Sequence, residues 1–409
     1  MRAKENIIVG LDVGTTKICA VVGEVSNKDV NIIGIGTHPS RGLRKGVVVN
    51  IESTEDSIKK AVEEAELMAG CEISSVYAGI AGSHITGFNS RGIVAIKGAE
   101  VVQADVDRVL DASRSLAIPA EREIIHTLAQ EFIVDDQAGI LNPVGMNGVR
   151  LEAKTHVVTA AVATANNIIK CANRAGLDVS DIVLESIASG QAVLAKEEKE
   201  LNGTALLDIG GGTSDLAIFA DKVIRHTFVL ALGGNNFTND LAIGLRTPVN
   251  EAEKVKQKYG SCLRMNEEPV ELIEVPSMGE GKPRKFSRQL VCEILAPRAE
   301  EIFALIKREI YRAGMEKAIT SGLVITGGSA MLNGIAEVAE FIFGIQTRVG
   351  KPRGIGGLVD VVNNPMYATG VGLVLYGAKN QAVKNFRSSE GNFFKRIVTR
   401  MKQWFKDVS

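Results

Sequence analysis

The sequence predicts an α/β protein in which two related domains face each other across a cleft. Residues 206–219 place two apolar, strand-like runs around a glycine-rich turn, and residues 9–22 repeat that pattern near the start of the chain. In each copy an aspartate, Asp208 or Asp12, ends the first run. The copies are too far apart for a tandem repeat of small units, so we expect each to form the central hairpin of its own domain.

Both turns are suited to binding phosphate. Glycines lack a Cβ, so they adopt positive φ angles and let backbone N–H groups converge on an anion. A carboxylate beside a polyphosphate needs a divalent cation between them, and Mg²⁺ held largely through its waters by Asp12 and Asp208 is the expected bridge. Alone, either turn could be an ordinary glycine-rich β-turn, and Lys17 could be a solvated lysine. The expected phosphate-site residues are Asp12, Gly14, Thr15, Thr16, Lys17, Asp208, Gly210, Gly211, Gly212 and Thr213.

The paired hairpins resemble the phosphate-1 and phosphate-2 motifs of the actin, Hsp70 and sugar-kinase superfamily. Residues 323–335 resemble its adenosine motif, a strand followed by Gly327, Gly328 and Ser329. A plain strand-to-helix turn is the alternative for that segment. The resemblance implies two actin-like (RNase H-like) domains around a cleft that binds ATP with Mg²⁺.

Composition agrees with a large globular protein. A chain of 409 residues exceeds what one hydrophobic core usually serves, so at least two domains are expected. The net charge of −1 gives no sign of a nucleic-acid partner. The five cysteines are scattered singly, which predicts reduced thiols without a metal or redox role. No signal peptide is expected, and no run approaches the roughly 18 to 20 apolar residues of a spanning helix.

The first half of the chain alternates strand and helix patterns around an insertion. Residues 58–69 have helical periodicity, with Ser53 or Thr54 as the expected cap and Gly70 as the end. Residues from about 84 to 159 have a different texture, typical of an inserted small domain. The other expected strands are 31–36, 46–50, 76–80, 92–97, 131–135, 154–163 and 182–184, and the other expected helices are 103–115, 165–175 and 187–198.

The residue that would orient an attacking water has two candidates near the helix expected at 187–198. The position of Glu185 resembles that of a glutamate in the Hsp70 and MreB-like members of the superfamily, and the position of Gln191 resembles that of a glutamine in actin. Their spacing corresponds to about 240° around a helix, so both can hardly face one phosphate. Glu185 is favoured, and a purely structural role for both is the alternative.

The second half predicts further core elements. Asn250 is expected to cap a charged helix over 251–259, in which Glu253 and Lys256 resemble the ribose and base contacts of MreB-like relatives. A solvated charge pair is the alternative. Pro297 would kink or divide a long helix over 287–313. The remaining expectations are strands at 223–230, 267–275, 322–325 and 347–349, helices at 238–244 and 367–377, a loop at 278–284, and completion of the globular fold near residue 378.

The last residues predict a membrane-binding helix behind a linker. Aromatic and aliphatic residues recur on one helical face, and basic residues occupy or flank the other. This pattern is typical of a helix lying in a lipid interface, where each basic residue adds roughly 1 kcal/mol near anionic headgroups. A helix docked on its own core or on another protein is the alternative. The expected membrane residues are Phe393, Phe394, Lys395, Arg396, Ile397, Val398, Arg400, Met401, Trp404 and Phe405.

An actin-like core with such a tail resembles the FtsA family of bacterial cell division proteins. The resemblance implies filament formation with copies of itself on the cytoplasmic face of the inner membrane at the septum. It implies binding of the FtsZ C-terminal peptide, with Arg284, Lys285, Arg288 and Arg298 as contact candidates, and binding of other divisome proteins through subdomain 1C. The implied parts are subdomain 1A (1–83, 161–201 and 366–378), 1C (84–160), 2A (202–226 and 312–365), 2B (227–311), a linker (379–391) and the amphipathic helix (392–407).

Gln191 departs from what the FtsA family leads one to expect, which leaves open whether ATP is hydrolysed; at most a slow ATPase activity is expected. Two other functions remain as alternatives. A pilus-assembly scaffold of the same actin-like group has a similar inserted domain but lacks the tail. A sugar kinase begins with the same Asp-Val-Gly-Thr-Thr segment but needs a catalytic aspartate in a larger substrate domain, and no such motif is present.

Overall fold

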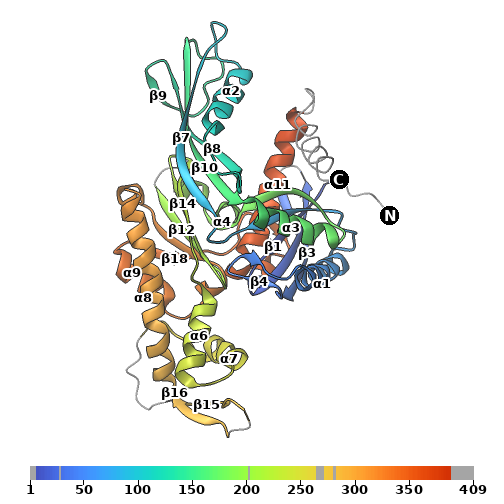
Figure 1. Ribbon diagram of the computed structural model, residues 1–409, viewed down its shortest axis with the longest axis vertical. Helices are drawn as coiled ribbons and strands as arrows, with labels where there is room; N and C mark the ends of the chain where they lie inside the picture. The colour runs from blue at the N-terminus through green and yellow to red at the C-terminus, as the bar shows by residue number, and fades with distance from the viewer. Residues whose placement is uncertain (1–5, 27–28, 201–202, 264–270, 280–281, 388–409) are drawn as a thin grey trace.

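The computed structural model describes residues 6–26, 29–200, 203–263, 271–279 and 282–387. Its outline is elongated, with an inserted β-rich domain at one end, a mainly helical domain at the other, and two sheet-containing domains between them (Figure 1). The predicted α/β class is therefore confirmed.

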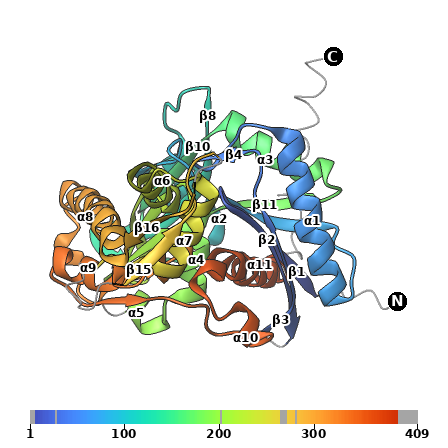
Figure 2. The same cartoon turned by 90° about the horizontal axis from the view of Figure 1, so that it is seen from below.

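The first central domain is built on a six-stranded sheet in the order β11-β6-β1-β2-β3-β19. Helices α1 (Ile51–Ala69) and α3 (Val162–Arg174) cover one face, and α11 (Ala368–Arg387) packs against the other, as Figure 2 shows for α1 and α11. The strands are β1 (Ile7–Val13), β2 (Lys17–Ser26), β3 (Asp29–Pro39), β6 (Ser75–Ile80), β11 (Asp178–Leu184) and β19 (Gly356–Gly357).

The second central domain repeats this plan with a five-stranded sheet in the order β14-β13-β12-β17-β18. In each sheet a central strand pairs antiparallel with the next strand of its hairpin and parallel with a later strand, as β1 does with β2 and β6, and β12 with β13 and β17. This shared topology supports the predicted duplication. The strands are β12 (Thr204–Ile209), β13 (Ser214–Ala220), β14 (Val223–Leu230), β17 (Gly322–Thr326) and β18 (Thr347–Val349).

The inserted domain has a sheet and a small core of its own. Its strands follow the order β7-β10-β8-β9, and α2 (Gln103–Arg114) packs on β7 and β10. Buried polar contacts dock it on both central domains: His126 Nε2 accepts from the Leu184 amide at 2.9 Å, and Gln130 Nε2 donates to the Ile224 carbonyl at 2.9 Å. The strands are β7 (Thr86–Ala95), β8 (Arg122–Val134), β9 (Gln137–Ile140) and β10 (Arg150–Ala161).

The domain at the opposite end is mainly helical and shares its core with the second sheet. Its longest helix, α8 (Arg288–Arg312), runs without interruption through Pro297, and Ser287 Oγ caps it by accepting from the Leu290 amide. Other helices and 3₁₀ turns of the chain are α4 (Glu185–Val193), α5 (Lys196–Glu200), α6 (Gly234–Leu245), α7 (Val249–Tyr259), α9 (Ile335–Phe343), α10 (Val359–Val362), η1 (Glu316–Ala318), η2 (Gly328–Met331) and η3 (Pro365–Tyr367), and the remaining strands are β4 (Leu43–Arg44), β5 (Val47–Val48), β15 (Leu272–Val275) and β16 (Arg284–Ser287).

Two of the predicted helix caps are wrong. Helix α1 begins a turn earlier than expected, because Asn50 Oδ1 accepts from the Ser53 amide at 2.9 Å and so fills the cap position. Helix α7 follows Pro248, whose fixed φ suits a helix start, so Asn250 lies inside the helix instead of capping it. Gly70 ends α1 in the left-handed conformation, as predicted.

Two other predicted boundaries also differ from the structure. The helix expected over 187–198 is two helices, α4 and α5, because the backbone is extended at Leu194. Helix α11 continues to Arg387, past residue 378 and through much of the segment 379–391 expected as a linker. Within the described residues, the strand expected over 267–275 is limited to β15, and β16 begins where the 278–284 loop was expected to end.

Helices α4 and α11 cross so closely that the crossing point excludes a side chain. A Cβ on Gly372 of α11 would lie 1.9 Å from the Ala188 carbonyl oxygen of α4. Because α4 also contacts β12 and β13 of the second domain, this crossing holds the two central domains together.

We expect Gly372→Ala to lower the free energy of unfolding by about 1–3 kcal/mol, since the added methyl forces the two helix backbones apart. Chemical denaturation would measure the change. Gly98→Ala is the control, because the nearest atom to its added Cβ is 3.8 Å away in an exposed loop. Equal stability of the two variants would contradict a tight crossing.

Candidate functional site

The tips of the two central hairpins have the same backbone geometry. In β1–β2 the Gly14 amide donates to the Lys17 carbonyl at 3.1 Å, and in β12–β13 the Gly210 amide donates to the Thr213 carbonyl at 2.9 Å. The aspartates also match in register, because Asp12 pairs with Cys19 and Asp208 with Asp215. The repeat seen in the sequence is therefore also a structural repeat.

The two tips meet across the cleft, and glycine is what lets them approach. A Cβ on Gly211 would lie 2.3 Å from Thr16 Cγ2, and one on Gly212 would lie 2.5 Å from Thr15 Oγ1. Any side chain at either glycine would push the hairpins apart. The predicted glycines thus serve both the backbone of the turn and the contact between domains.

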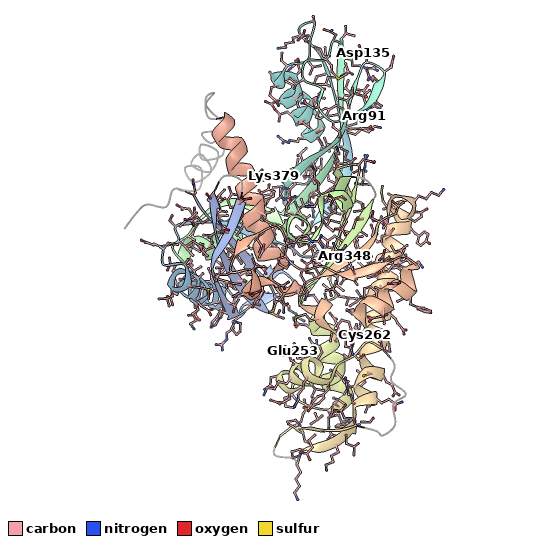
Figure 3. The ribbon with its side chains drawn as sticks, turned by 180° about the vertical axis from the view of Figure 1, so that it is seen from behind. Arg91, Asp135, Glu253, Cys262, Arg348 and Lys379 are labelled. Atoms are coloured by element: carbon pink, nitrogen blue, oxygen red, sulfur yellow. The ribbon has the colours of Figure 1, made fainter. Side chains whose placement is uncertain are left out.

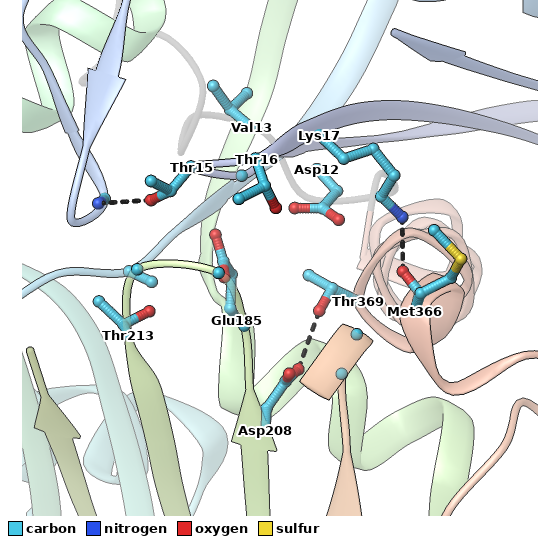
Figure 4. A pocket seen from close by; sticks show the side chains of 18 residues that line it. Asp12, Val13, Thr15, Thr16, Lys17, Glu185, Asp208, Thr213, Met366 and Thr369 are labelled. Atoms are coloured by element: carbon cyan, nitrogen blue, oxygen red, sulfur yellow. Dashed lines mark hydrogen bonds between the residues drawn. The ribbon is translucent and has the colours of Figure 1, made fainter. Parts of the chain in front are cut away.

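A cavity lies between the tips, with about 650 Å³ of empty space when its open side is included (Figure 4). All ten predicted phosphate-site residues line it. The lining consists of Asp12, Val13, Gly14, Thr15, Thr16, Lys17, Gly46, Ala81, Glu185, Asp208, Gly210, Gly211, Gly212, Thr213, Gly327, Gly328, Met366 and Thr369.

The third predicted motif forms one end of this cavity. Gly327 has a φ of 87°, and a Cβ there would lie 2.3 Å from Asp208 Oδ1, so the backbone passes directly over that carboxylate. Nothing lies within 4 Å of a Cβ on Gly328, which leaves open space beside the chain. Ser329 is not part of the wall, since its hydroxyl donates to the Gly210 carbonyl at 3.2 Å.

Among the described residues, three carboxyl groups line the cavity, those of Asp12, Glu185 and Asp208, and Asp215 lies beside Asp208 in the second hairpin; burial raises the pKa of each. The pKa of Asp208 is raised to about 6 and that of Asp215 to about 8, mainly because water is excluded from them. Burial also raises the pKa of Asp12, and that of Glu185 lies well above its usual value because burial is reinforced by neighbouring carboxylates. A cation entering this site would favour the charged forms.

Hydrogen bonds hold two of these carboxyl groups in place. Thr369 Oγ1 donates to Asp208 Oδ2 at 3.0 Å (Figure 4), and Thr213 Oγ1 donates to Asp215 Oδ2 at 2.8 Å. Within the described residues, the buried Asp215 Oδ1 has no hydrogen-bond partner. The site therefore retains unmet demand for a proton or a positive charge.

Among the residues that the structure describes, Lys17 is the only basic one that lines the cavity. Its ammonium donates to the Met366 carbonyl and lies 4.5 Å from the centre of the Tyr367 ring, which fixes it against η3 (Figure 4). The backbone carbonyl and the aromatic face both attract a cation without neutralising it. The side chain of Lys17 is therefore held beside Asp12, where an anionic ligand could meet it.

The structure separates the two candidates for orienting water. Glu185, the first residue of α4, lines the cavity between the two hairpins (Figure 4). Gln191 lies further along the same helix, is partly buried, and does not line the cavity. Only Glu185 is placed to contact a ligand there.

Glu253 and Lys256 lie in the helical domain outside the cavity wall, where Figure 3 labels Glu253. They form an ion pair at 2.6 Å, and Lys256 Nζ also donates to the Gly234 carbonyl at 3.1 Å and to Thr238 Oγ1 at 2.9 Å. Gly234 in turn lies against Gly210 and Gly211 of the second hairpin. The pair is therefore partly buried, unlike the solvated pair that was the alternative. Through Gly234 it contacts the outer side of the second hairpin's turn.

Several lining residues carried no recognisable signal in the sequence. Thr369 and Met366 come from the segment around the start of α11, and Gly46 and Ala81 come from two loops of the first domain. Thr369 was part of a small-residue helix expected to close the fold, and its role toward Asp208 depends on how α11 packs. The one sign of this role in the sequence was that Thr369 is a polar residue in the first turn of a helix made mostly of small and apolar residues.

Comparison with known proteins identifies the family. Residues 205–372 match the family model for cell division protein FtsA, and residues 82–159 match that for the SHS2 domain inserted in FtsA. Cell division protein FtsA of Pseudomonas aeruginosa is 50% identical to this chain, and the match covers 97% of each chain. The FtsA protein of Neisseria meningitidis serogroup B is 41% identical, and the match covers 100% of each chain. The FtsA protein of Escherichia coli K12 is 39% identical, and the match covers 98% of this chain and 96% of that one.

The chain belongs to the FtsA family. Solved structures agree on the fold: a PilM–PilN type IV pilus biogenesis complex has a TM-score of 0.66 at 17% identity, covering 91% of this chain and 98% of that one. MreB5 of Spiroplasma citri bound to ADP has a TM-score of 0.55 at 16% identity, covering 94% and 99%. The predicted actin-like fold and the predicted family are both confirmed.

The four basic residues predicted to contact the FtsZ peptide differ in whether their charged groups already have partners within the protein. Arg298 pairs with Asp240 at 2.7 Å and also with Glu301, and Arg288 pairs with Glu271 at 3.1 Å. Arg284 donates to the carbonyls of Leu245 and Arg246. Lys285 is exposed, and its one ion pair with a described residue is a long 3.7 Å contact with the exposed Glu274, so its charge is the most accessible of the four.

The amphipathic tail expected at residues 392–407 lies outside the described residues. Among the helices that are described, none has the length and apolar character required to span a bilayer. The four cysteines Cys19, Cys171, Cys262 and Cys292 are buried and Cys71 is half-buried, and within the described residues none of the five forms a disulfide bond.

We expect Asp215→Asn to stabilise the protein increasingly from about pH 4 to about pH 8. The wild-type carboxyl keeps its proton in the folded state up to about pH 8, whereas the unfolded chain loses it near 3.8. Folding thus takes up a proton in this interval, and wild-type stability falls as pH rises. Asparagine has no such proton, and it can still accept the Thr213 hydrogen bond.

Denaturation across pH would measure the difference between variant and wild type. Asp136→Asn is the control, because Asp136 is fully exposed. A difference for Asp215→Asn that stays constant between pH 4 and pH 8 would contradict the raised pKa.

Proposed function

We propose that this protein is an ATP- and Mg²⁺-binding cell division adaptor that polymerises on the cytoplasmic face of the bacterial inner membrane at the septum and anchors FtsZ filaments there. The paired hairpin tips around Lys17, Asp12 and Asp208 are the observation that carries the nucleotide part of this proposal. Family membership carries the division part, because the full-length relatives are named as cell division proteins.

The cavity suits a polyphosphate. Its wall offers backbone amides at two glycine turns, threonine hydroxyls and one lysine, which are the groups that bind phosphate oxygens. Solved MreB5 structures with the same fold are described as bound to ADP and to AMPPNP. ATP would then place its phosphates between the hairpins, with its base toward Gly327 and Gly328.

Mg²⁺ would offset the buried carboxyl groups. No three His, Cys, Asp or Glu side chains in the described part of the chain converge to hold an ion by themselves. Mg²⁺ commonly keeps several waters and takes its other ligands from one or two carboxylates and substrate phosphates. Asp12 and Asp208 are the two carboxylates that fit this arrangement.

Hydrolysis would be slow or regulatory. Glu185 is the candidate for orienting water, but burial and the neighbouring carboxylates raise its pKa well above the usual value, so the charged form that would act as a base is disfavoured unless a cation enters the cavity. Gln191 lies outside the cavity and offers no substitute. Nucleotide would therefore act mainly by holding the two domains together, as a filament subunit requires.

The other assignments follow the family. The inserted domain, residues 84–160, would be subdomain 1C and a contact for further divisome proteins, and the match at residues 82–159 supports its limits. Residues 227–311 would be subdomain 2B and would receive the FtsZ C-terminal peptide, with Lys285 as the most accessible basic residue. Residues 392–407 would bind anionic lipid. Full-length identity to FtsA proteins favours this function over a pilus scaffold or a sugar kinase.

We expect Lys17→Ala and Asp208→Ala each to weaken ATP binding in the presence of Mg²⁺ by about 10- to 100-fold, since each removes a charge-assisted contact. Calorimetry on the full chain would measure this. Lys60→Ala and Asp111→Ala are charge-matched controls on exposed helix surfaces. Unchanged affinity in Lys17→Ala or Asp208→Ala would show that the nucleotide site is wrongly assigned.

We expect the full chain to sediment with anionic vesicles and to bring FtsZ down in the presence of ATP. A version ending at Arg387 keeps α11 whole and should leave both proteins in solution. If both versions sediment equally, or neither does, the tail is not a membrane anchor. Capture of a pilus inner-membrane peptide in place of FtsZ would favour the scaffold alternative.

A further inference from the structure

The turn between β4 and β5 reaches the cavity although it belongs to none of the predicted motifs. Its Gly46 lines the cavity and donates its amide hydrogen to Thr15 Oγ1 at 3.0 Å, which Figure 4 shows as the bond between Thr15 and the neighbouring loop. Lys45 stands next to Gly46 at the turn's tip. The first hairpin therefore fixes the position of this turn.

Lys45 also lies against the second hairpin. A Cβ on Gly212 would be 2.9 Å from Lys45 Cα, so the two backbones are nearly in contact. Thr15, Gly212 and Lys45 thus meet where the two hairpin tips come together. Gly327 and Gly328 lie in the third motif at another part of the cavity wall, where we place the nucleotide base, so the Lys45 end is where a chain of phosphates would finish.

The backbone of Lys45 is held in an unfavourable conformation. Its φ is 51°, in the left-handed region that costs a non-glycine residue about 1–2 kcal/mol. Its neighbour Gly46 also has a positive φ, 77°, and fits closely against Ala81, whose carbonyl oxygen would be 2.5 Å from a Cβ on Gly46. Such strain persists only where surrounding contacts impose it, and it is concentrated at functional sites.

The side chain of Lys45 is available for a ligand. It is exposed, and within the described residues its ammonium has no hydrogen-bond or ion-pair partner. Lys17, in contrast, is fixed against Met366 and Tyr367. A lysine is a mobile point charge on a flexible stem, suited to meeting a phosphate that arrives at the mouth of a site.

We propose that Lys45 binds the terminal phosphate of a nucleoside triphosphate and so distinguishes the triphosphate from the diphosphate. The proposal rests on the proposed nucleotide function and names a residue that no motif of the site includes. Lys17 serves the phosphates that both nucleotides share, and Lys45 serves the one that only the triphosphate has.

The location of the turn gives this contact a consequence. Gly46 abuts Ala81 and Gly82, with the Gly82 Cα 3.1 Å from a Cβ built on Gly46. The chain enters the inserted domain at this point, since the domain match begins at residue 82. A phosphate that draws Lys45 inward pulls on a turn that touches the first residues of that domain.

The test is the affinity of full-length Lys45→Gln for ATP and for ADP, each with Mg²⁺, by calorimetry. Loss of one charge-assisted phosphate contact should weaken ATP binding about tenfold or more and leave ADP binding within about twofold of wild type. Arg44→Gln is the matched control, because Arg44 is the exposed, basic neighbour on the same turn. It should bind both nucleotides as wild type does.

A second variant separates charge from backbone strain. Lys45→Gly suits a φ of 51° and keeps the turn folded, so it should lose the preference for ATP as Lys45→Gln does. The inference is overturned if either variant keeps the wild-type preference, or if Lys45→Gln weakens ATP and ADP binding equally. If the wild-type protein binds neither nucleotide, the proposed function fails first, and this inference fails with it.

Discussion

The close approach of two glycine turns is the constraint on which the rest of this structure depends. Gly211 and Gly212 lie against Thr16 and Thr15 of the other domain at distances that exclude a Cβ. This contact brings carboxyl groups from both hairpins into one buried space, where loss of water raises their pKa values. Within the part of the chain that the structure describes, three carboxyl residues and one lysine line the cavity, a combination that favours cation and phosphate together.

The outer parts of the molecule are tied to this centre through short, specific contacts. Helix α11 supplies Thr369 to Asp208 and crosses α4 at Gly372, so the same helix positions a carboxylate and holds the domains together. The β4–β5 turn links the cavity to the first residues of the inserted domain through Gly46 and Ala81. A ligand that draws the hairpins together would also displace the residues in these contacts, because closely packed groups transmit a displacement to their neighbours.

Much of the fold could be predicted from local patterns. The two hairpins, α8 and the inserted domain's limits were visible because apolar periodicity and glycine turns are properties of short segments. Helix ends were less accessible. Asn50 and Pro248 took the cap positions expected for neighbouring residues, and α11 ran on through a polar stretch that local composition favours as a linker.

The sequence by itself determined the duplicated hairpins and the acidic and glycine residues at their tips, because each hairpin is a short continuous segment. It determined the family because several such segments occur together along the chain. Only the tertiary structure decided that Glu185, not Gln191, faces the cavity, that Glu253 and Lys256 brace the cleft from outside its wall, and that Lys45 stands where the hairpins meet. These facts depend on how segments far apart in the chain pack together, and that packing is set by long-range contacts that no local pattern records.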